Sequence, residues 1–549
     1  MHGWSGCLRG SCLRPFDASG VFQPSEDDNV ELRLLAVQGA GATVLSSGLG
    51  LAIQIVATAI LARLLTAADF GLVTMVTTFS LLLVNFGLNG FTEAVLQWEE
   101  ISHALASNLF WINLCTGALL TIGFAATGSL LARFYGEPRV AHVTIGISST
   151  IFLTSASVLH LALLKRAMRF SATSANDILS RVVSVGVAIL LASTGWGYWA
   201  LVAGAVAQPL SSLMGAWFLC RWVPGLPRAL AQTRSMLRFA MNVYGRFSLN
   251  YFARNLDNLL VGWRFQAQAL GFYKKAYDLF ALSAAQLVSP LANVAVSALR
   301  RLSKDPTQYK RYLLKSLSVT AFVGMGLGAD LTLVGKDVIR LLLGPGWEEA
   351  GRIFTFFGPG IGIMLVYYTH GWIHLSIGRA DRWFRWGILE LISTGLLFAL
   401  ALPWGPVGVA AAWTLSFWIL TIPAFWYAGN PINLQVSAVI ATLWKYPLAS
   451  LLAGCISAVI SRRILPLAAS SGSAGAFLRI VAISALFIAF YLSTIIILHG
   501  GCVPLLQVAR LAGDMVPNGS HSRMSTITTV LRRVGSRETR ILTSDRRVS

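Results

Sequence analysis

The stretch GAFLRIVAISALFIAFYLSTIIIL (475–498) holds one charged residue, Arg479, in a run that is otherwise almost entirely apolar. A helix of about 20 apolar residues spans the ~30 Å hydrocarbon core of a bilayer. The stretch therefore predicts a membrane-spanning helix. Comparable runs recur from about residue 40 to about residue 500, so the same reasoning extends over most of the chain.

The composition agrees with a membrane protein that crosses the bilayer many times. Of 549 residues, 55% are hydrophobic and 12% are charged, and the mean hydropathy is +0.66. A β-barrel would need apolar and polar residues in strict alternation, which the sequence lacks. We predict an all-α polytopic membrane protein with about fourteen transmembrane helices, at roughly 40–63, 70–92, 107–132, 141–164, 178–194, 198–220, 243–264, 279–300, 313–335, 351–376, 384–402, 406–428, 437–459 and 475–498.

The net charge of +20 comes from arginines and lysines between the spans and at the end of the chain. Basic residues concentrate in cytoplasmic loops of membrane proteins. This distribution favours cytoplasmic N- and C-termini. It also explains the positive net charge without binding of nucleic acid. The six cysteines form no CxxC pair, so neither a disulfide framework nor a zinc site is indicated.

Three pairs of short motifs recur in the same order along the chain. DFGLV (69–73) and ALGFY (269–273) lie 200 residues apart, and ARFYGEP (132–138) precedes IRLLLGP (339–345) by a similar distance. GWGYWAL (195–201) precedes PWGPVGV (403–409) in the same way. We interpret spans 1–6 and 7–12 as two copies of one six-helix bundle, as in many secondary transporters.

This interpretation gives five segments. Residues 1–30 have no apolar signal-peptide core and read as a doubtful or disordered extension, and 504–549 read as a basic, disordered cytoplasmic tail. Between them we predict an N-lobe (31–222), a C-lobe (223–430) and two extra spans (431–503).

The seventh span carries charges where hydrocarbon should exclude them. At 100° per residue, five polar side chains fall on one helical face, namely Arg246, Asn250, Arg254, Asp257 and Arg264. A charge at the bilayer centre costs about 2.5–3.5 kcal/mol on insertion scales. This face must therefore meet another helix or a water-filled cavity.

Two interpretations of this face compete. In the first, Arg254 and Asp257 pair within the helix and help the span pack against its neighbours. In the second, the surplus arginine charge faces a cavity and binds an anion. Three arginines stand against one aspartate, so the face cannot neutralise itself. We favour anion binding, with Asp257 holding an arginine in place.

The second span shows a related pattern in NFGLNGFTEAVLQ (85–97). Asn85, Asn89, Glu93 and Gln97 are four residues apart and therefore share one helical face. Glu93 lies near the end of the span, so it either reaches back to the interface or is buried. If buried, it could titrate and couple transport to a proton or a sodium ion, and Asp257 is the other candidate for this coupling.

Other polar residues in or near the spans give weaker signals. The acids Asp177, Asp330 and Glu390 each stand alone in the sequence. His370 and His374 have a spacing that could bind a metal, but no carboxylate or cysteine is near them, so we favour a polar contact at a helix interface. The sequence has no HExxH, P-loop or GxSxG motif, and we predict no catalytic residue, no metal site and no cofactor.

Four stretches resemble the Wzx-type polysaccharide and O-antigen flippases, which form the polysaccharide transporter branch of the multidrug/oligosaccharidyl-lipid/polysaccharide exporter superfamily. They are LARLLTAADFGLVTM (61–75), NFGLNGFTEAVLQ (85–97), ARNLDNLLVGWRFQAQALGFYKKAY (253–277) and LLLGPGWEEAG (341–351). The resemblance covers nearly all of 31–500. Asn85 departs from it, because an acid is expected in that turn.

The resemblance implies a flippase that is not an enzyme. Such proteins move undecaprenyl-diphosphate-linked oligosaccharide from the cytoplasmic to the periplasmic leaflet of the bacterial inner membrane, by alternating access. Besides this cargo, membrane lipids and the polymerase and chain-length or export proteins of the same pathway are the expected partners. The cargo feeds O-antigen, capsule or exopolysaccharide assembly.

The cargo suggests roles for the polar residues, since arginine binds phosphate oxygens through its planar fork. We expect the diphosphate to be held by Arg246, Arg254, Arg264 and Lys274. Asp257 would order the arginines. The sugar hydroxyls would meet the asparagines Asn85, Asn89, Asn250 and Asn258.

Three other functions compete with this one. An ion-coupled exporter of drugs or metabolites from the same superfamily would need an apolar or acidic cavity. The arginines of span 7 disfavour such a cavity. A membrane polysaccharide polymerase or glycosyltransferase usually needs a large outer loop or a DxD-type cluster, and neither is visible. The repeat and the polar faces argue against a membrane scaffold without transport activity.

Overall fold

The computed structural model describes Phe16, Phe22 and residues 29–85, 91–97, 100–228, 231–464 and 473–502. Within the helices, the side chains of 29–40, of 282–294 and of some single residues lie outside the description. Apart from one isolated bridge between Phe16 and Phe22, the described residues form helices and short links.

Eleven segments of the described chain are long and apolar enough to cross a membrane. The predicted all-α polytopic membrane fold is confirmed. The spans are Leu45–Leu64, Ala67–Asn85, His103–Ala126, Arg139–Arg166, Phe170–Ser193, Tyr198–Cys220, Pro306–Leu343, Glu348–Ser376, Asp381–Ile432, Val436–Arg462 and Ser473–His499.

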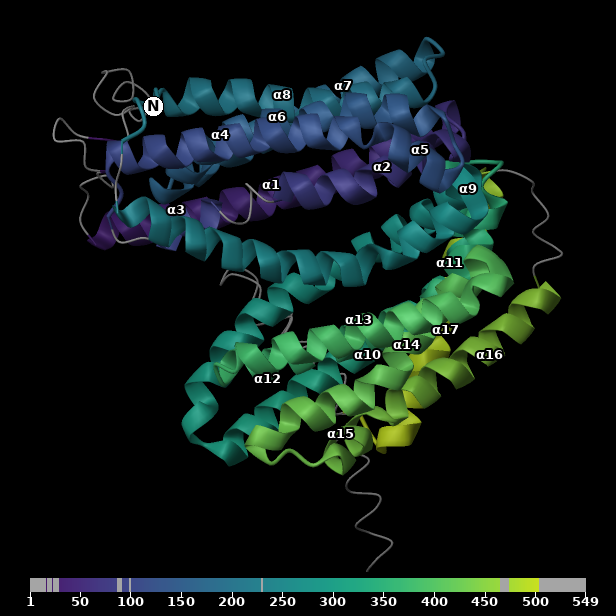
Figure 1. The fold of residues 1–549 in the computed structure, drawn as a ribbon. Coiled ribbons are helices and arrows are strands. Elements are labelled where there is room, and N and C mark those ends of the chain that lie inside the picture. Colours follow the sequence, from purple (N-terminus) through teal and green to yellow (C-terminus); the bar gives the residue numbers. More distant parts are fainter. Residues whose placement is uncertain are drawn as a thin grey trace, which may run out of the picture. The chain divides into compact units, whose positions relative to one another are not determined.

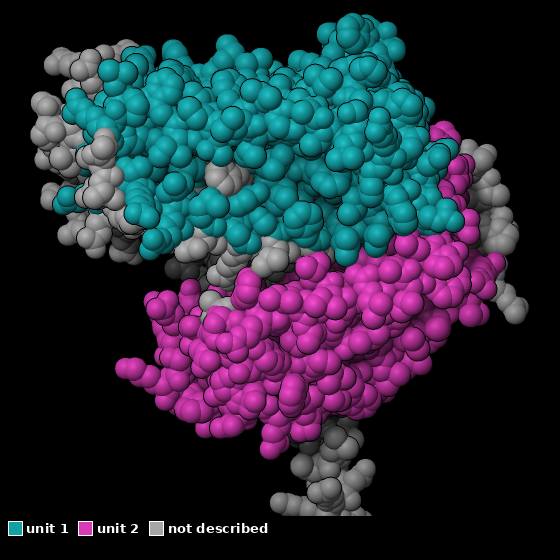
Figure 2. Space-filling view, in the orientation of Figure 1, with its two compact units in different colours: residues 1–274, 342–344 teal, residues 275–341, 345–549 magenta. Residues whose placement is uncertain are grey.

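The chain divides into two compact units, which Figure 2 colours separately. Unit 1 comprises residues 1–274 and 342–344, and unit 2 comprises 275–341 and 345–549. The predicted segment bounds at 31–222, 223–430 and 431–503 stay a prediction.

Unit 1 is a bundle of helices that pack along their lengths (Figure 1). Helix α6 packs against α2, α4 and α8, and α7 packs between α1 and α8. The helices are α1 (Asn29–Leu64), α2 (Ala67–Asn85), α3 (Thr92–Gln97), α4 (His103–Ala126), α5 (Gly128–Tyr135), α6 (Arg139–Arg166), α7 (Phe170–Ser193), α8 (Tyr198–Cys220) and the first part of α9 (Ala231–Arg301).

One hydrophobic cluster of unit 1 includes a residue from the N-terminal extension. Phe22 is 6% exposed and lies among Leu105, Val158 and Trp222, and the Arg166 guanidinium lies 5.4 Å from the centre of its ring. The Phe22 amide donates to the Ile101 carbonyl at 3.0 Å. The segment predicted to be disordered thus contributes a buried side chain to unit 1.

A capping box sets the start of α2. The Thr66 and Asp69 side chains lie 2.6 Å apart, and each accepts a hydrogen bond from the backbone N–H of the other. This reciprocal arrangement satisfies N–H groups that a helix start leaves without a partner. The chain therefore breaks between α1 and α2 at Leu65 and Thr66.

The break between α1 and α2 has a counterpart 200 residues later, which is a kink without a capping box. The backbone leaves helical geometry at Gln266, which has a φ of 65° and a ψ of −174°, so α9 consists of two helices that meet at a kink. Gln266 and Ala269 occupy the positions of Thr66 and Asp69 in the second copy of the motif, and they cannot form the capping box. The predicted spans 243–264 and 279–300 therefore lie in the two helices on either side of this kink.

The repeated motifs DFGLV (69–73) and ALGFY (269–273) each contain a glycine that contacts the backbone just before the other motif. A side chain at Gly71 would meet the Ala267 backbone, and a side chain at Gly271 would meet the Ala67 backbone. Ala67 and Ala267 are also 200 residues apart. Each glycine therefore contacts the alanine that precedes the other glycine by four residues. We name this pair of contacts the reciprocal glycine contact. It agrees with the repeat that the sequence predicts at these residues.

Unit 2 contains the rest of α9 and the helices that follow. Helix α11 packs against α14, α13 packs against α14, and α16 packs against α17. The helices are α10 (Pro306–Leu343), α11 (Glu348–Tyr368), α12 (His370–Ser376), α13 (Ala380–Ala401), α14 (Gly405–Gly429), α15 (Val436–Leu443), α16 (Lys445–Ile464) and α17 (Ser473–His499), with short 3-10 turns at Leu302–Lys304, Leu402–Trp404 and Asn430–Ile432.

Aromatic rings fill part of the core of unit 2. Phe280 stacks on Phe357 with ring centres 5.4 Å apart, and Trp413 meets both rings edge-on. Such pairs prefer stacked or edge-on geometry because of the ring quadrupole. They fix α9, α11 and α14 to one another.

Two acids of α10 face α17 in unit 2. Asp337 accepts from Arg479 at 2.6 Å, and Asp330 accepts from the Ser484 hydroxyl at 3.0 Å. The isolated acid Asp330 thus has a hydroxyl partner. The single charge in the stretch 475–498 is neutralised by Asp337.

Candidate functional site

The predicted polar face of span 7 lies on α9, and the structure describes part of it. Asp257 and Asn258 are each 1% exposed, and Arg264 is exposed. The side chains of Arg246, Asn250 and Arg254 lie outside the described residues. The arginine-lined anion site on this face stays a prediction.

Asp257 is held by groups of its own helix. One carboxylate oxygen accepts from the Tyr273 hydroxyl at 2.8 Å, and the other accepts from the Asn258 backbone N–H at 2.8 Å. Tyr273 lies beyond the kink at Gln266, so the hydrogen bond joins the two parts of α9. A buried carboxylate needs such donors, because the loss of water is otherwise uncompensated. The predicted ordering of arginines by Asp257 stays a prediction.

Replacing Tyr273 with phenylalanine is expected to destabilise unit 1 by about 1.5–3 kcal/mol, the usual contribution of a hydrogen bond to a charged group. The loss should also increase proteolysis near Gln266, because the hydroxyl bridges the kink. Thermal unfolding in detergent and limited proteolysis measure the two effects. If Tyr273→Phe destabilises Asp257→Ala protein as much as wild type, the two side chains do not act together.

The remaining candidates of this region lie near the kink. Asn258 donates to the Asn255 side chain at 3.3 Å, and its own carbonyl oxygen is buried with no hydrogen-bond partner in the described part of the chain. The Arg264 guanidinium lies 5.7 Å from the Phe265 ring, and Lys274 is half-buried. Their binding of substrate stays a prediction.

The predicted polar face of span 2 is described at its two ends. Asn85 closes α2 and donates to the Leu81 carbonyl at 2.7 Å, whereas Glu93 is exposed in the first turn of α3. Asn89 and the Gln97 side chain lie outside the described residues. Alignment of these residues on one face, and ion coupling through Glu93 or Asp257, stay predictions.

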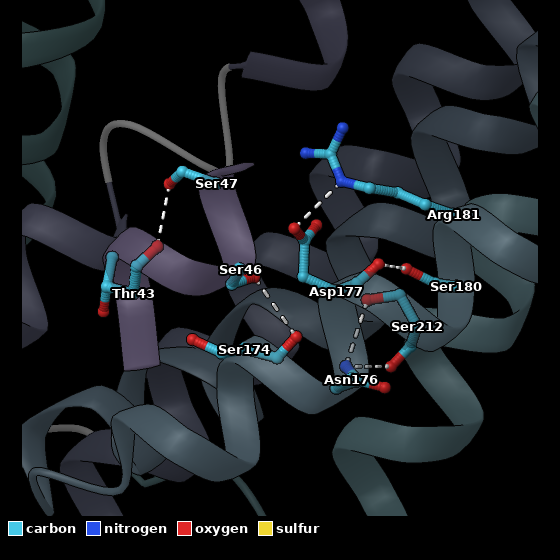
Figure 3. A network of polar contacts seen from close by, with 9 residues as sticks. All are labelled: Thr43, Ser46, Ser47, Ser174, Asn176, Asp177, Ser180, Arg181 and Ser212. Carbon is cyan, nitrogen blue, oxygen red and sulfur yellow. Dashed lines mark hydrogen bonds and ion pairs between the residues drawn. The ribbon is translucent and has the colours of Figure 1, made fainter. Parts of the chain in front are cut away.

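A charged pair lies midway along the membrane span α7, where the sequence analysis missed it. Arg181 Nε donates to the Asp177 carboxylate at 2.9 Å, and 38% of the arginine side chain and 46% of the aspartate side chain are exposed (Figure 3). Asp177 is therefore not isolated, as the sequence analysis assumed. The two residues are four apart, and that spacing was the available signal.

Small polar residues of α1, α7 and α8 surround this pair. Ser46 donates to the Ser174 carbonyl at 3.5 Å, and Asn176 donates to the Ser212 carbonyl at 3.2 Å (Figure 3). Gly50 of α1 lies beside the Arg181 side chain, where an added Cβ would be 3.6 Å away. We call Ser46, Gly50, Asp177 and Arg181 the α7 polar site.

The α7 polar site offers groups suited to an anion that carries hydroxyls. The terminal nitrogens of Arg181 have no hydrogen-bond partner within the described ranges. A guanidinium donates in a fork that matches two phosphate oxygens. Because a partly exposed charge inside a membrane span must face water or a polar ligand, this site is a candidate for substrate.

Comparisons with solved structures define the class of the fold. The structure titled lipid II flippase MurJ, in an inward closed conformation, is similar with a TM-score of 0.67 at 15% identity, over 84% of this chain and 99% of that chain. A multidrug resistance MATE family transporter of the MOP superfamily, facing inward, gives 0.57 at 14% identity, over 69% and 94%. The fold is that of these multi-pass helical membrane proteins.

Comparisons of sequence define the family. Residues 60–352, more than half of the chain, match the polysaccharide biosynthesis protein family, and this chain belongs to that family. The succinoglycan biosynthesis transport protein ExoT of Rhizobium meliloti is 22% identical over 65% of this chain and 72% of that protein. The lipopolysaccharide biosynthesis protein WzxC of Escherichia coli is 24% identical over 72% and 80%. The predicted resemblance to Wzx-type flippases is confirmed.

Proposed function

We propose that this protein moves undecaprenyl-diphosphate-linked oligosaccharide across the bacterial inner membrane by alternating access. Its family and the relatives named for succinoglycan and lipopolysaccharide biosynthesis support a role in polysaccharide assembly. The described apolar helices support a multi-pass membrane location. We further propose that the protein transports its substrate without altering it, and that both termini are cytoplasmic.

The observation that carries this proposal is the α7 polar site. A diphosphate with an attached sugar presents anionic oxygens and hydroxyls. Arg181 has terminal nitrogens without a partner among the described residues, and the same site includes the Ser46 hydroxyl. Charged residues inside membrane spans usually face a water-filled cavity or a substrate pathway. The lipid tail needs no polar site, since it can stay in the bilayer while the head group moves.

The cargo is delivered and consumed by other proteins in this proposal. Membrane lipids surround the tail, and the polymerase and chain-length or export proteins of the same pathway receive the flipped unit. Transport is coupled to a proton or a sodium ion. Rocking of two lobes would expose the head group first to the cytoplasm and then to the periplasm.

The test is a flipping assay in proteoliposomes with a fluorescent polyprenyl-diphosphate oligosaccharide, read by its accessibility to an added enzyme. Wild type should move the probe, and Arg181→Gln should slow it at least about tenfold, because a charged hydrogen bond contributes about 1.5–3 kcal/mol. Arg181→Lys should recover part of the rate, since lysine keeps the charge but lacks the fork.

The matched control is Arg352→Gln, which removes an exposed ion pair with Glu349 in unit 2. It should flip the probe at the wild-type rate. Equal rates for wild type and Arg181→Gln would remove the α7 polar site from the proposal. Wild-type protein that moves cationic dyes but no polyprenyl-diphosphate probe would instead indicate a drug exporter.

A further inference from the structure

Two histidines of unit 2 are buried where the proposed function does not use them. His370 and His374 are 3% and 0% exposed, and they lie on α12 between α11, α13 and α14. Their ring centres are 6.0 Å apart. The sequence analysis interpreted them as polar contacts at a helix interface.

The hydrogen bonds of His370 fix which nitrogen carries its proton. Nδ1 lies 2.5 Å from the Tyr367 carbonyl oxygen, and a carbonyl only accepts. Nδ1 is therefore the donor, and Nε2 of the neutral ring presents a lone pair. That Nε2 is buried with no hydrogen-bond partner among the described residues.

His374 lacks more hydrogen-bond partners than His370 does among the described residues. Both of its ring nitrogens are buried without a partner in the described part of the chain. Beside it, the Arg382 guanidinium lies 4.2 Å from the centre of the Tyr427 ring and donates from Nη2 to the Tyr427 carbonyl at 2.6 Å. The Nε of Arg382 is also buried and unpartnered in this region of the structure.

Charged and titratable groups approach the pair from every neighbouring helix. Those named by contacts with the pair or with its partners are Tyr367 of α11, Asp381, Arg382 and Glu390 of α13, and Tyr427 of α14. Tyr309 of α10 contacts Ser376 at the end of α12. The Tyr367 hydroxyl accepts from Trp386 Nε1 at 2.8 Å. The site thus combines one arginine with two carboxylates at its edge.

Unpartnered buried nitrogens are costly, at about 1–3 kcal/mol for each group. Native proteins rarely keep such groups without a ligand, water or a functional reason. A metal is disfavoured, because no cluster of three or more histidine, cysteine, aspartate or glutamate side chains occurs in the described ranges. The ligand that two imidazoles accept without further side chains is a proton, carried to them by water.

We propose that His370 and His374 form a proton-binding site inside unit 2, and that it makes the proton the coupling ion. This proposal rests on the transport function proposed above. His370 Nε2 takes a proton from water, while Nδ1 keeps its bond to the Tyr367 carbonyl. No other bond changes, and the proton returns to water on the other side. A positive charge on the pair acts on Arg382 and Asp381, the charged groups of α13 beside His374, so uptake favours a different packing of α12 against α13.

The direct test measures proton uptake without transport. Exchange of the imidazole C2 hydrogen for deuterium, followed by mass spectrometry, reports the protonation and water access of each histidine. Between about pH 3 and pH 8, a range wide enough for a buried histidine, the rate at His370 should rise with pH and then level off. A rate that stays flat over this range, or exchange too slow to detect, would overturn the proposal.

The second test uses the same flipping assay with a pH difference across the proteoliposome membrane. The difference should change the wild-type rate several-fold, and His370→Gln should flip the probe at a rate independent of it. The control is His142→Gln, which replaces an exposed histidine of α6. Full pH dependence in His370→Gln would overturn the proposal, and His374→Gln provides a second variant if the first is unstable.

The two tests separate the proposals from each other. If His370 titrates but wild-type protein flips no probe, the proton site stands and the flippase function fails. If wild-type protein flips the probe but His370 does not titrate, the flippase function stands and the proton site fails.

Discussion

Replacing Gly271 with alanine should lower the free energy of unfolding of unit 1 by about 3 kcal/mol or more, the upper end for overpacking a tight contact. The added methyl group would overlap the Ala67 backbone, which has no rotamer to change. Relief requires α2 and α9 to move apart, and that loosens the same contact at Gly71. The measurements are protein abundance in the membrane and thermal unfolding in detergent.

Gly186→Ala is the matched control. Gly186 lies in the membrane span α7, and an added Cβ would meet nothing within 4 Å. Alanine is the better helix former by about 1 kcal/mol, so this variant should be neutral or slightly more stable. Opposite signs for one substitution at two helical glycines would identify close packing as the cause. Equal stability of both variants would show that the backbones are not in tight contact.

Replacing Asp337 with leucine should lower the free energy of unfolding of unit 2 by about 3 kcal/mol, as when one partner of a buried ion pair is removed. Arg479 Nε and Nη2 both donate to one oxygen of Asp337, and each side chain is 20% exposed. Without the carboxylate, α17 would hold an unpaired cation in an apolar span. Unfolding in increasing concentrations of a denaturing detergent measures the loss.

The double variant Asp337→Leu with Arg479→Leu should regain most of that stability, because an apolar pair often replaces a buried ion pair without loss. Glu349→Leu is the control, since its pair with Arg352 is exposed and should contribute less than about 1 kcal/mol. A double variant no more stable than Asp337→Leu would show that the unpaired charge is not the cause.

The long apolar helices were predictable because burial in hydrocarbon demands a continuous run of residues. The predicted spans 198–220 and 475–498 correspond to α8 (Tyr198–Cys220) and α17 (Ser473–His499). Helix α9 was less predictable. Residues 265–278, which the predicted spans leave as a link, are helical on both sides of the kink at Gln266.

The polar contacts were harder to predict, since each joins residues that only the fold brings together. The sequence identified Asp257 as a charge that needs a partner, yet the partner is Tyr273 beyond a kink. The predicted span 5 began at residue 178, which left Asp177 outside the span. The pairing of Asp177 with Arg181 was therefore not recognised. A helix that begins at Phe170 puts both residues one turn apart on the same face.

The reciprocal glycine contact bears on the ancestry of this protein. When two identical chains meet around a two-fold axis, residue i of one contacts residue j of the other, and j contacts i in return. Gly71 with Ala267, and Gly271 with Ala67, reproduce that exchange inside one polypeptide. This is the arrangement expected if a half-length ancestor assembled as a homodimer before gene duplication and fusion joined its subunits. Such a fusion would leave the two copies free to diverge, and Gln266 and Ala269 differ from Thr66 and Asp69 at the positions of the capping box.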